Sequence, residues 1–347
     1  MASETNPPVN QPTPPAPMAP PPGMPPIYIQ FPKQGRGTKI ILIIVVLLLL
    51  GSIAINLSLM AAVAMFTGTG PFATRVVQEG EKDQTIAVYN IVGAIDDRQA
   101  AMFRRFVKHA IEDEDIKAVV LRVDSPGGGV SSSDQMNSKV RELVASRKNV
   151  VVSMGGMAAS GGYYVSVPAE KIYAEPTTVT GSIGVIAMMP ILKGTMEKIG
   201  AEIVILRSDK ARDNKALLNP FEEPNERGRQ QMLDLLNAMQ ARFEDAVFDG
   251  RKSVLSRAEV DAVSNGETYL AEQAKKLRLI DEIGYLDDAI DEAARLAGLG
   301  DPHVVRYDRR AGLFEQIAGE ANVNVDVDLD PFDNDQTPRI LMLWRGD

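Results

Sequence analysis

From Thr85 onward, the chain alternates between two kinds of apolar pattern, one typical of strands and one typical of helices. Together they predict an α/β domain. Short apolar runs typical of buried strands alternate with longer runs whose apolar positions recur at helical spacing. Such alternation favours right-handed crossover units and a mainly parallel sheet. The expected extended segments are residues 85–95, 118–123, 150–154, 171–174, 182–188 and 202–207. The expected helices are residues 98–112, 133–145, 190–199, 227–249, 258–263, 271–277 and 286–297, with a short one opening at Ser160.

Composition divides the chain into four parts. Residues 1–38 are crowded with proline and carry little charge, so they cannot bury enough surface to offset the entropy of ordering. We expect a disordered or polyproline-like tail there, followed by an apolar block at residues 39–67. One domain without internal repeats is expected over residues 84–300, and an acidic extension over residues 301–347.

The apolar block is long enough to cross a membrane as a helix. It shows no polar face, and no ionisable side chain lies between Lys39 and Arg75. Because the block is long and begins far from Met1, an uncleaved signal anchor is favoured over a cleaved signal peptide. The positive-inside rule then keeps the proline-rich tail in the cytoplasm and exports everything after about residue 67. The expected location is a bacterial inner membrane, crossed once, with the domain on the periplasmic or extracellular side.

Charge and composition narrow the classes of partner. The formal net charge is −9 and the sequence pI about 5.0, and clustered Lys and Arg are missing, so nucleic acid is not an expected partner. With no cysteine and two histidines, zinc and iron–sulfur sites are improbable, and no cofactor is expected. The C-terminal acidic residues lack the spacing of an EF-hand and are read as a solvated linker. They are Asp326, Asp328, Asp330, Asp333 and Asp335.

Two glycine-rich turns carry the candidate chemistry. Ser160 stands in the run Met157-Ala-Ala-Ser-Gly-Gly-Tyr-Tyr164, directly after a predicted strand and at the start of a predicted helix. Its small neighbours would let a substrate backbone approach closely. A second turn, Asp124-Ser-Pro-Gly-Gly-Gly129, also follows a predicted strand, and two such turns can form an oxyanion hole around one serine. Taken alone, the Ser160 segment also fits an ordinary glycine-rich helix start.

The base that would activate this serine is not a histidine. His109 lies on a solvated helix face, and His303 falls in the weakly patterned region after Gly300, so neither makes a convincing triad partner. A lysine held neutral by burial can accept the serine proton instead, because desolvation lowers its pKa.

Three motifs in order and register resemble the signal peptide peptidase A family. They are Asp124-Ser-Pro-Gly-Gly-Gly129, Ala159-Ser-Gly-Gly-Tyr-Tyr164 and Thr180-Gly-Ser-Ile-Gly-Val185, and the resemblance extends over about residues 84–299. It implies a membrane-anchored Ser-Lys peptidase of the ClpP/crotonase-like fold, which cleaves remnant signal peptides and other apolar peptides through an acyl-enzyme. It also implies that Ser160 is the nucleophile, that Ser182 hydrogen-bonds the catalytic lysine, and that the N–H groups of Gly128 and Gly161 form the oxyanion hole.

The position of the lysine depends on how the segment before Pro220 is aligned with the family. Counting back from the Pro-Phe pair selects Lys215, whereas counting forward from Ser208 selects Arg212, with Lys210 nearby. Arginine stays protonated and cannot act as the base. Apolar residues follow Lys215 and could supply the desolvation that a neutral amine needs, so Lys215 is favoured over Lys210.

The chain holds one copy of the motifs, whereas the resembling family joins two units in tandem or assembles single units into a ring. The resemblance therefore implies a homo-oligomer, an octamer, in which the serine and the lysine come from different subunits. An extended peptide could pair with the strand edge near residues 127–130. Two other readings remain open: a crotonase-type acyl-CoA enzyme on the same scaffold, and a non-catalytic membrane scaffold.

Overall fold

The computed structural model describes residues 36–67, 72–211, 219–309 and 340–343. The chain divides into two units, residues 1–68 and residues 69–347. In the first unit, helix α1 (Arg36–Thr67) contains the apolar window Lys39–Met60, with a mean hydropathy of 3.1 and no part of it buried. Its length and composition suit a membrane span. The amide of Asn56 donates to the carbonyl of Ser52 at 2.7 Å, so this polar side chain is satisfied within the helix.

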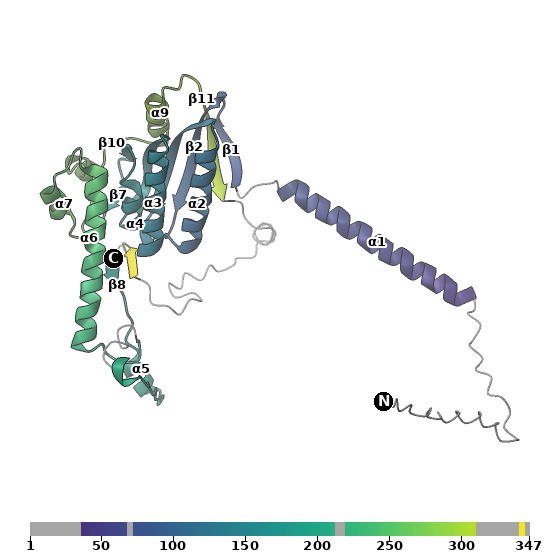
Figure 1. Cartoon of the computed structure of the whole chain (residues 1–347), viewed down its shortest axis with the longest axis horizontal. Coiled ribbons are helices and arrows are strands. Elements are labelled where there is room, and N and C mark those ends of the chain that lie inside the picture. Colours follow the sequence, from purple (N-terminus) through teal and green to yellow (C-terminus); the bar gives the residue numbers. More distant parts are fainter. Residues whose placement is uncertain (1–35, 68–71, 212–218, 310–339, 344–347) are drawn as a thin grey trace, which may run out of the picture. The chain divides into compact units, whose positions relative to one another are not determined.

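The second unit is built on a nine-stranded mixed sheet, which confirms the predicted α/β class (Figure 1). The path of seven strands runs β1-β11-β2-β3-β5-β6-β10, with β7 on β5 and β9 on β7. All pairs from β11 to β10 are parallel, whereas β1–β11 and β7–β9 are antiparallel. The strands are β1 (Phe72–Gln78), β2 (Glu81–Val92), β3 (Ile116–Ser125), β5 (Asn149–Ala159), β6 (Lys171–Ala174), β7 (Val179–Gly181), β9 (Thr268–Leu270), β10 (Glu282–Ile283) and β11 (Pro302–Arg309).

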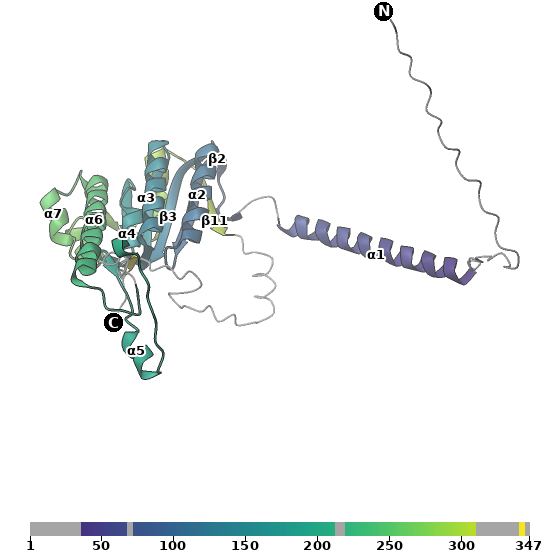
Figure 2. The ribbon, with the colours of Figure 1, turned by 60° about the horizontal axis from the view of Figure 1, so that its bottom comes forward.

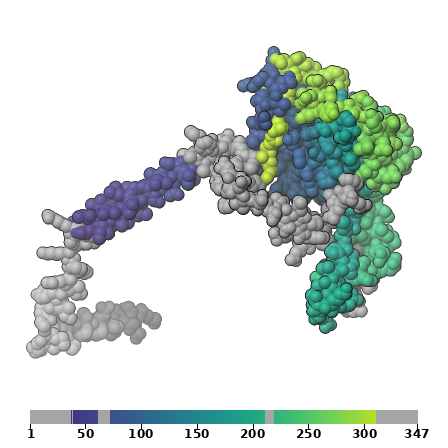
Figure 3. Space-filling view, turned by 180° about the vertical axis from the view of Figure 1, so that it is seen from behind, coloured from purple at the N-terminus to yellow at the C-terminus, as the bar shows by residue number. Residues whose placement is uncertain are grey.

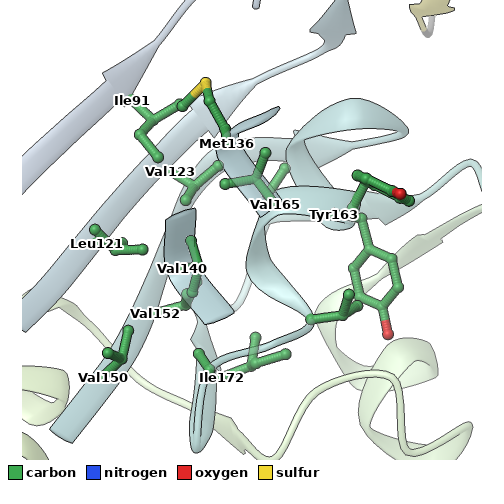
Figure 4. Packing of buried hydrophobic residues seen from close by; sticks show 14 of the residues in the cluster. Ile91, Leu121, Val123, Met136, Val140, Val150, Val152, Tyr163, Val165 and Ile172 are labelled. Atoms are coloured by element: carbon green, nitrogen blue, oxygen red, sulfur yellow. The ribbon is translucent and has the colours of Figure 1, made fainter. Parts of the chain in front are cut away.

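Helices cover both faces of this sheet. Because side chains alternate along a strand, Ala87 and Tyr89 of β2 join the larger core cluster, whereas Ile86 and Val88 join the smaller one on the other face. The larger cluster receives α2 (Asp97–Glu112), α3 (Val130–Ala145) and α4 (Gly161–Ser166), and the smaller receives α9 (Leu286–Ala297). Figure 4 shows strand, α3 and α4 side chains meeting in the larger cluster. The labelled residues are Ile91, Leu121, Val123, Met136, Val140, Val150, Val152, Tyr163, Val165 and Ile172.

The remaining helices lie toward the β10 end of the sheet or beyond it. They are α6 (Glu226–Arg251), α7 (Arg257–Val263) and α8 (Ala271–Lys276). Helix α5 (Lys193–Lys198) and the short 3₁₀ turn η1 (Asp209–Ala211) belong to an arm, residues 186–211, and α5 lies away from the sheet (Figures 1 and 2). From behind, the teal segment around α5 extends from the body of the domain (Figure 3).

A second, three-stranded sheet stands beside the main one. Its order is β4-β12-β8, with β4 (Gly127–Gly129), β12 (Ile340–Leu343) and β8 (Ile186–Ala187). Both pairings are antiparallel, so the last described segment of the chain lies between the glycine turn and the start of the arm.

Most predicted elements are confirmed, and β6 and α9 have the predicted bounds. Helix α3 begins earlier than predicted, at Val130, because Gly129 leads directly from β4 into the helix, and no side chain caps it. Residues 131 and 132, predicted to precede the helix, therefore lie inside it. Of the extended segment expected at 182–188, two residues form a strand, and residues 202–207 form neither strand nor helix.

The sheet also extends beyond the residues expected to form the domain. Strand β11 lies between β1 and β2, whereas the sequence pattern assigned residues 301–347 to an acidic extension. Polar residues such as Arg306 and Asp308 obscure its pattern, while Val304, Val305 and Tyr307 are buried. Residues that flank the predicted domain on both sides thus complete its sheet.

Candidate active site

Ser160 occupies a strained turn between β5 and α4. Its backbone has φ 53° and ψ −115°, a left-handed φ that non-glycine residues rarely adopt and that costs about 1–3 kcal/mol. The side chain is 1 % exposed, and its Oγ has no hydrogen-bond partner within the described parts of the chain. A buried, unsatisfied hydroxyl on a strained turn is destabilising, which makes the position a functional candidate.

Backbone hydrogen bonds hold this turn against β7. The Ser160 N–H donates to the Gly181 carbonyl at 2.8 Å, and the Ser160 carbonyl accepts from the Tyr164 N–H at 2.9 Å. Ser182 therefore follows the residue to which Ser160 is bonded. It too is buried and left-handed, with φ 50°, and its N–H donates to the Glu267 carbonyl at 2.7 Å. The structure thus brings Ser160 and Ser182 onto adjacent turns.

The two glycine turns are packed against each other so closely that side chains do not fit. A methyl group on Gly161 would lie 3.2 Å from the Gly127 Cα, 3.2 Å from the Gly128 nitrogen and 2.5 Å from the Ser133 Oγ. A methyl group on Gly128 would lie 2.1 Å from the carbonyl oxygen of Ile95. Gly128 and Gly161, predicted as oxyanion donors, are therefore neighbours, and Gly161 directly follows Ser160, the predicted nucleophile.

Backbone hydrogen bonds to Ile95 hold the glycine turn at β4 in place. The Ile95 N–H donates to the Gly127 carbonyl at 2.8 Å, and the Gly129 N–H donates to the Ile95 carbonyl at 2.8 Å. The Ser125 Oγ accepts from the Gly127 N–H at 3.1 Å. These bonds hold both flanks of Gly128, so its position relative to Ser160 does not depend on a bound substrate.

Ser133 is a site residue that the sequence pattern did not single out. It is fully buried on α3 beside Gly161, and its Oγ has no partner among the described residues. The run of three serines gives no signal that distinguishes this one, because their different surroundings come from the contact of α3 with α4.

A charged cluster anchors α4, the helix that follows Ser160. Asp134 accepts a hydrogen bond from the Tyr164 hydroxyl at 2.7 Å, and Arg242 donates to both its carboxylate oxygens at 2.8 and 2.9 Å. Burial acts to raise the pKa of Asp134, but the hydrogen bonds from Arg242 and Tyr164 outweigh it and lower this pKa. Burial raises the pKa of Tyr164, so its phenol stays protonated at neutral pH. The cluster ties α3, α4 and α6 together.

The structure places the other candidate residues apart from Ser160 or does not describe them. Lys215 and Arg212 lie outside the described residues, and Lys210 is exposed in η1. The His109 Nε2 lies 3.3 Å from the Tyr307 hydroxyl, beside β11. His303, expected in an irregular region, is buried in β11, and β2 and β3 separate that strand from β5. At about 4.8 Å per strand, both histidines are too far from Ser160 to act on it directly.

No group of three or more potential metal ligands occurs among the residues that the structure describes.

The sequence is similar to proteins of one peptidase family. The family model described as Peptidase family S49 matches residues 142–300. A putative protease of Synechocystis sp. is 33% identical over 230 residues, which cover 64% of this chain and 78% of that protein. A putative signal peptide peptidase of Enterococcus faecium is 29% identical over 265 residues, with 73% and 76% covered. Protease 4 of Salmonella typhi is 35% identical over 215 residues, 61% of this chain, but this chain spans 33% of its length.

Two solved protease structures are also similar to this chain. The 1510-N membrane-bound stomatin-specific protease, in complex with a substrate peptide, has a TM-score of 0.43 at 16% identity, covering 69% of this chain and 97% of that one. ClpP1 from Listeria monocytogenes has a TM-score of 0.38 at 15% identity, covering 58% and 92%.

Proposed function

This chain belongs to peptidase family S49, and from that premise we propose that it is a membrane-anchored serine endopeptidase with a Ser-Lys dyad. The observation that carries the proposal is the Ser160 turn: a strained, buried serine with an unpartnered hydroxyl beside two close-packed glycine turns. The family's ClpP/crotonase-like fold agrees with the mixed α/β sheet.

In the proposed mechanism, a neutral lysine accepts the proton of Ser160 as its Oγ attacks the peptide carbonyl. The N–H groups of Gly128 and Gly161 stabilise the oxyanion, and such donors are typically worth about 10²–10³ in kcat each. The protonated lysine then gives its proton to the leaving amine, and water hydrolyses the acyl-enzyme by the same route. Ser182 holds the lysine amine in place through a hydrogen bond.

Lys215 is the proposed base. The alternative, Lys210, is exposed in η1 and so lacks the burial that the proposed base requires, unless another subunit covers it. We expect Lys215→Ala and Lys215→Arg to be inactive, because arginine cannot accept the proton, whereas Lys210→Ala keeps most activity. Activity that survives in Lys215→Ala would reassign the role to Lys210.

The proposed assembly is a homo-octamer in which the dyad is shared between subunits. Exposed apolar side chains along the arm support association with further copies, since Val204 is 74% and Leu206 90% exposed. Mixing inactive Ser160→Ala subunits with inactive Lys215→Ala subunits should restore partial activity, because some interfaces then pair an intact serine with an intact lysine. Mixed oligomers without any recovery would place both residues of the dyad in one chain.

The proposed substrates are remnant signal peptides and other apolar peptides, cleaved on the periplasmic or extracellular side of a bacterial inner membrane. The basic residues that precede the apolar run, Lys33, Arg36 and Lys39, support this orientation. Protease added outside spheroplasts should digest the domain and spare the proline-rich tail. Digestion of the tail with protection of the domain would invert the topology.

Labelling of Ser160 by a fluorophosphonate tests the proposed function most directly. We expect covalent labelling of the full chain, loss of labelling in Ser160→Ala, and hydrolysis of an apolar peptide ester by the unmodified protein. The same experiment separates a peptidase from the two other readings, because neither a crotonase-type acyl-CoA enzyme nor a scaffold needs a reactive serine here. A chain that is folded but resists labelling would refute the assignment.

A further inference from the structure

Strand β5 carries a bulge shortly before the Ser160 turn. Its register with β3 shifts between two consecutive pairs, Val123↔Met154 and Ser125↔Ala158. One residue of β3, Asp124, therefore stands opposite residues 155–157 of β5. Such a bulge bends the strand and leaves backbone N–H and C=O groups without their usual partners on the neighbouring strand. We call residues 155–157 the β5 bulge.

Side chains from both neighbouring segments hold the β5 bulge. On the side of β3, the carboxylate of Asp124 accepts a hydrogen bond from the Met157 N–H at 3.1 Å. On the other side, the hydroxyl of Thr178, which directly precedes β7, donates to the Gly155 carbonyl at 2.6 Å. Thr178 is fully buried, whereas Asp124 is exposed. Both ends of the bulge are therefore fixed by side chains and not by strand pairing alone.

Thr180 holds the peptide group that lies between the β5 bulge and the Ser160 turn. It is fully buried, and its hydroxyl donates to the Ala158 carbonyl at 2.7 Å. In the parallel pairing of β5 with β7, Thr180 is opposite Ala158, and Gly181, which accepts from the Ser160 N–H, is opposite Ala159. The peptide group that Thr180 fixes links Ala158 to Ala159. It directly precedes the peptide group that leads into Ser160.

The left-handed backbone of Ser160 depends on such anchors. A strained conformation of a non-glycine residue persists only where the surrounding structure over-determines it. If the β5 bulge were loosened, Ser160 would relax toward an unstrained φ, and its Oγ would move relative to the proposed oxyanion donors, Gly128 and Gly161. A misplacement of about 1 Å in a reacting group can cost about 10²-fold in rate.

We propose that Asp124, Thr178 and Thr180 are positioning residues of the peptidase site, which act through the backbone of β5 to keep Ser160 in its strained turn. This inference rests on the proposed function, since the shape of the turn affects turnover only if Ser160 is the nucleophile. The two threonines contribute more than Asp124, because their hydrogen bonds are buried, whereas water can replace an exposed carboxylate.

The test compares Thr180→Val with a matched control, Thr85→Val, in the full chain in detergent. Thr85 is also buried, and its hydroxyl also donates to a backbone carbonyl, that of Lys82, at 2.7 Å. It lies in β2, however, and β3 separates that strand from β5. Both replacements keep the size of the side chain and remove one buried hydrogen bond, so urea unfolding should show similar losses of stability.

The two variants should differ in turnover of an apolar peptide ester. We expect kcat to fall about 10–100-fold in Thr180→Val and to stay within about twofold in Thr85→Val, with KM little changed in both. Fluorophosphonate labelling of Ser160 should slow by the same factor as kcat falls. Thr178→Val should behave like Thr180→Val, whereas Thr180→Ser keeps the hydroxyl and should retain most of the turnover.

Two variants of Asp124 test the exposed anchor, where a failure to fold is not expected. Asp124→Ala removes the acceptor for the Met157 N–H and should lower kcat several-fold. Asp124→Asn keeps an oxygen that accepts this hydrogen bond and should behave like the parent. Equal losses in both variants would show that the charge matters and not the hydrogen bond, and would overturn the positioning role of Asp124.

Hydrogen exchange separates this inference from the catalytic assignment, because it does not depend on activity. The backbone amides of residues 155–160 should exchange faster in Thr180→Val than in the parent, and at the parent's rate in Thr85→Val. Parent-like kcat in Thr180→Val, or an equal loss of kcat in Thr85→Val, would overturn the positioning role. Faster exchange in Thr180→Val, together with a parent chain that no fluorophosphonate labels, would instead overturn the proposed function.

Discussion

Gly161→Ala tests how tightly the two glycine turns are coupled. The new methyl group would lie 2.5 Å from the Ser133 Oγ and 3.2 Å from both the Gly127 Cα and the Gly128 nitrogen. Such overpacking of a close-packed interior costs about 1–3 kcal/mol. The turns must separate by a few tenths of an ångström, which also displaces an oxyanion donor, so we expect kcat to fall about 10²–10³-fold.

A second substitution distinguishes the contribution of each contact. Ser133→Ala removes the Oγ, which has no partner among the residues that the structure describes, so alone it should leave both stability and kcat nearly unchanged. In Gly161→Ala it relieves the contact at 2.5 Å but leaves both contacts at 3.2 Å with the β4 turn. The double variant should therefore regain much of the lost stability and little of the lost activity.

Urea unfolding of the detergent-solubilised protein, together with turnover of an apolar peptide ester, measures both quantities in the four chains. Recovery of kcat in parallel with stability would mean that the loss of activity was a general effect of a weakened fold. Unchanged kcat in Gly161→Ala would refute the reasoning altogether, since the oxyanion donors would then tolerate separation of the turns.

Three further outcomes are expected. Ser160→Ala should lose several orders of magnitude in turnover. It should unfold at no lower urea concentration than the parent, because it removes a buried hydroxyl that has no partner among the described residues. Near-normal turnover would refute the assignment of Ser160 as the nucleophile. Arg251→Ala should cost about 3–5 kcal/mol in urea unfolding, since it leaves the carboxylate of Asp281 buried without its bidentate partner. The matched Arg257→Ala, at an exposed ion pair, should cost much less, and equal costs would contradict the argument. Because the pKa of Asp134 is lowered in the folded state, its ionised form stabilises the fold above about pH 4, and this contribution is lost as pH falls through the folded-state pKa. The free energy of unfolding of the parent should therefore exceed that of Asp134→Asn by less in acid than at neutral pH. A difference that grows in acid would contradict the direction of the pKa shift.

The strand–helix alternation and the Ser160 turn could be predicted because both are local. Each depends on a short window: an apolar run, a glycine pair, an amphipathic repeat. Helix α9, with its predicted bounds, is an example, and its apolar face packs on the sheet as a helical repeat requires. The turn at Ser160 was likewise visible as small residues between a strand and a helix.

What could not be predicted depends on contacts between distant segments. Strand β11 carries His303, Arg306 and Asp308, and only its place between β1 and β2 shows why Val304 and Tyr307 are buried. Ser133 lies at the site because α3 packs against α4, and β12 forms because it pairs with β4 and β8, which are distant in the sequence. The spacing of apolar residues within one segment does not show which distant segment it will contact.

The position of β11 sets the order in which the domain can be completed. It separates two strands that precede nearly all of the domain, and the contact between the side chains of Asn90 and Asp308 spans 218 residues. A chain emerging from the ribosome N-terminus first, at about 5–20 residues per second, offers β2 for roughly 10–40 seconds before its neighbour exists. Throughout that interval a long, largely apolar strand has an open edge. Biogenesis of this protein therefore includes a period in which the chain is prone to aggregation, and this period ends only when β11 has been made and pairs with β2.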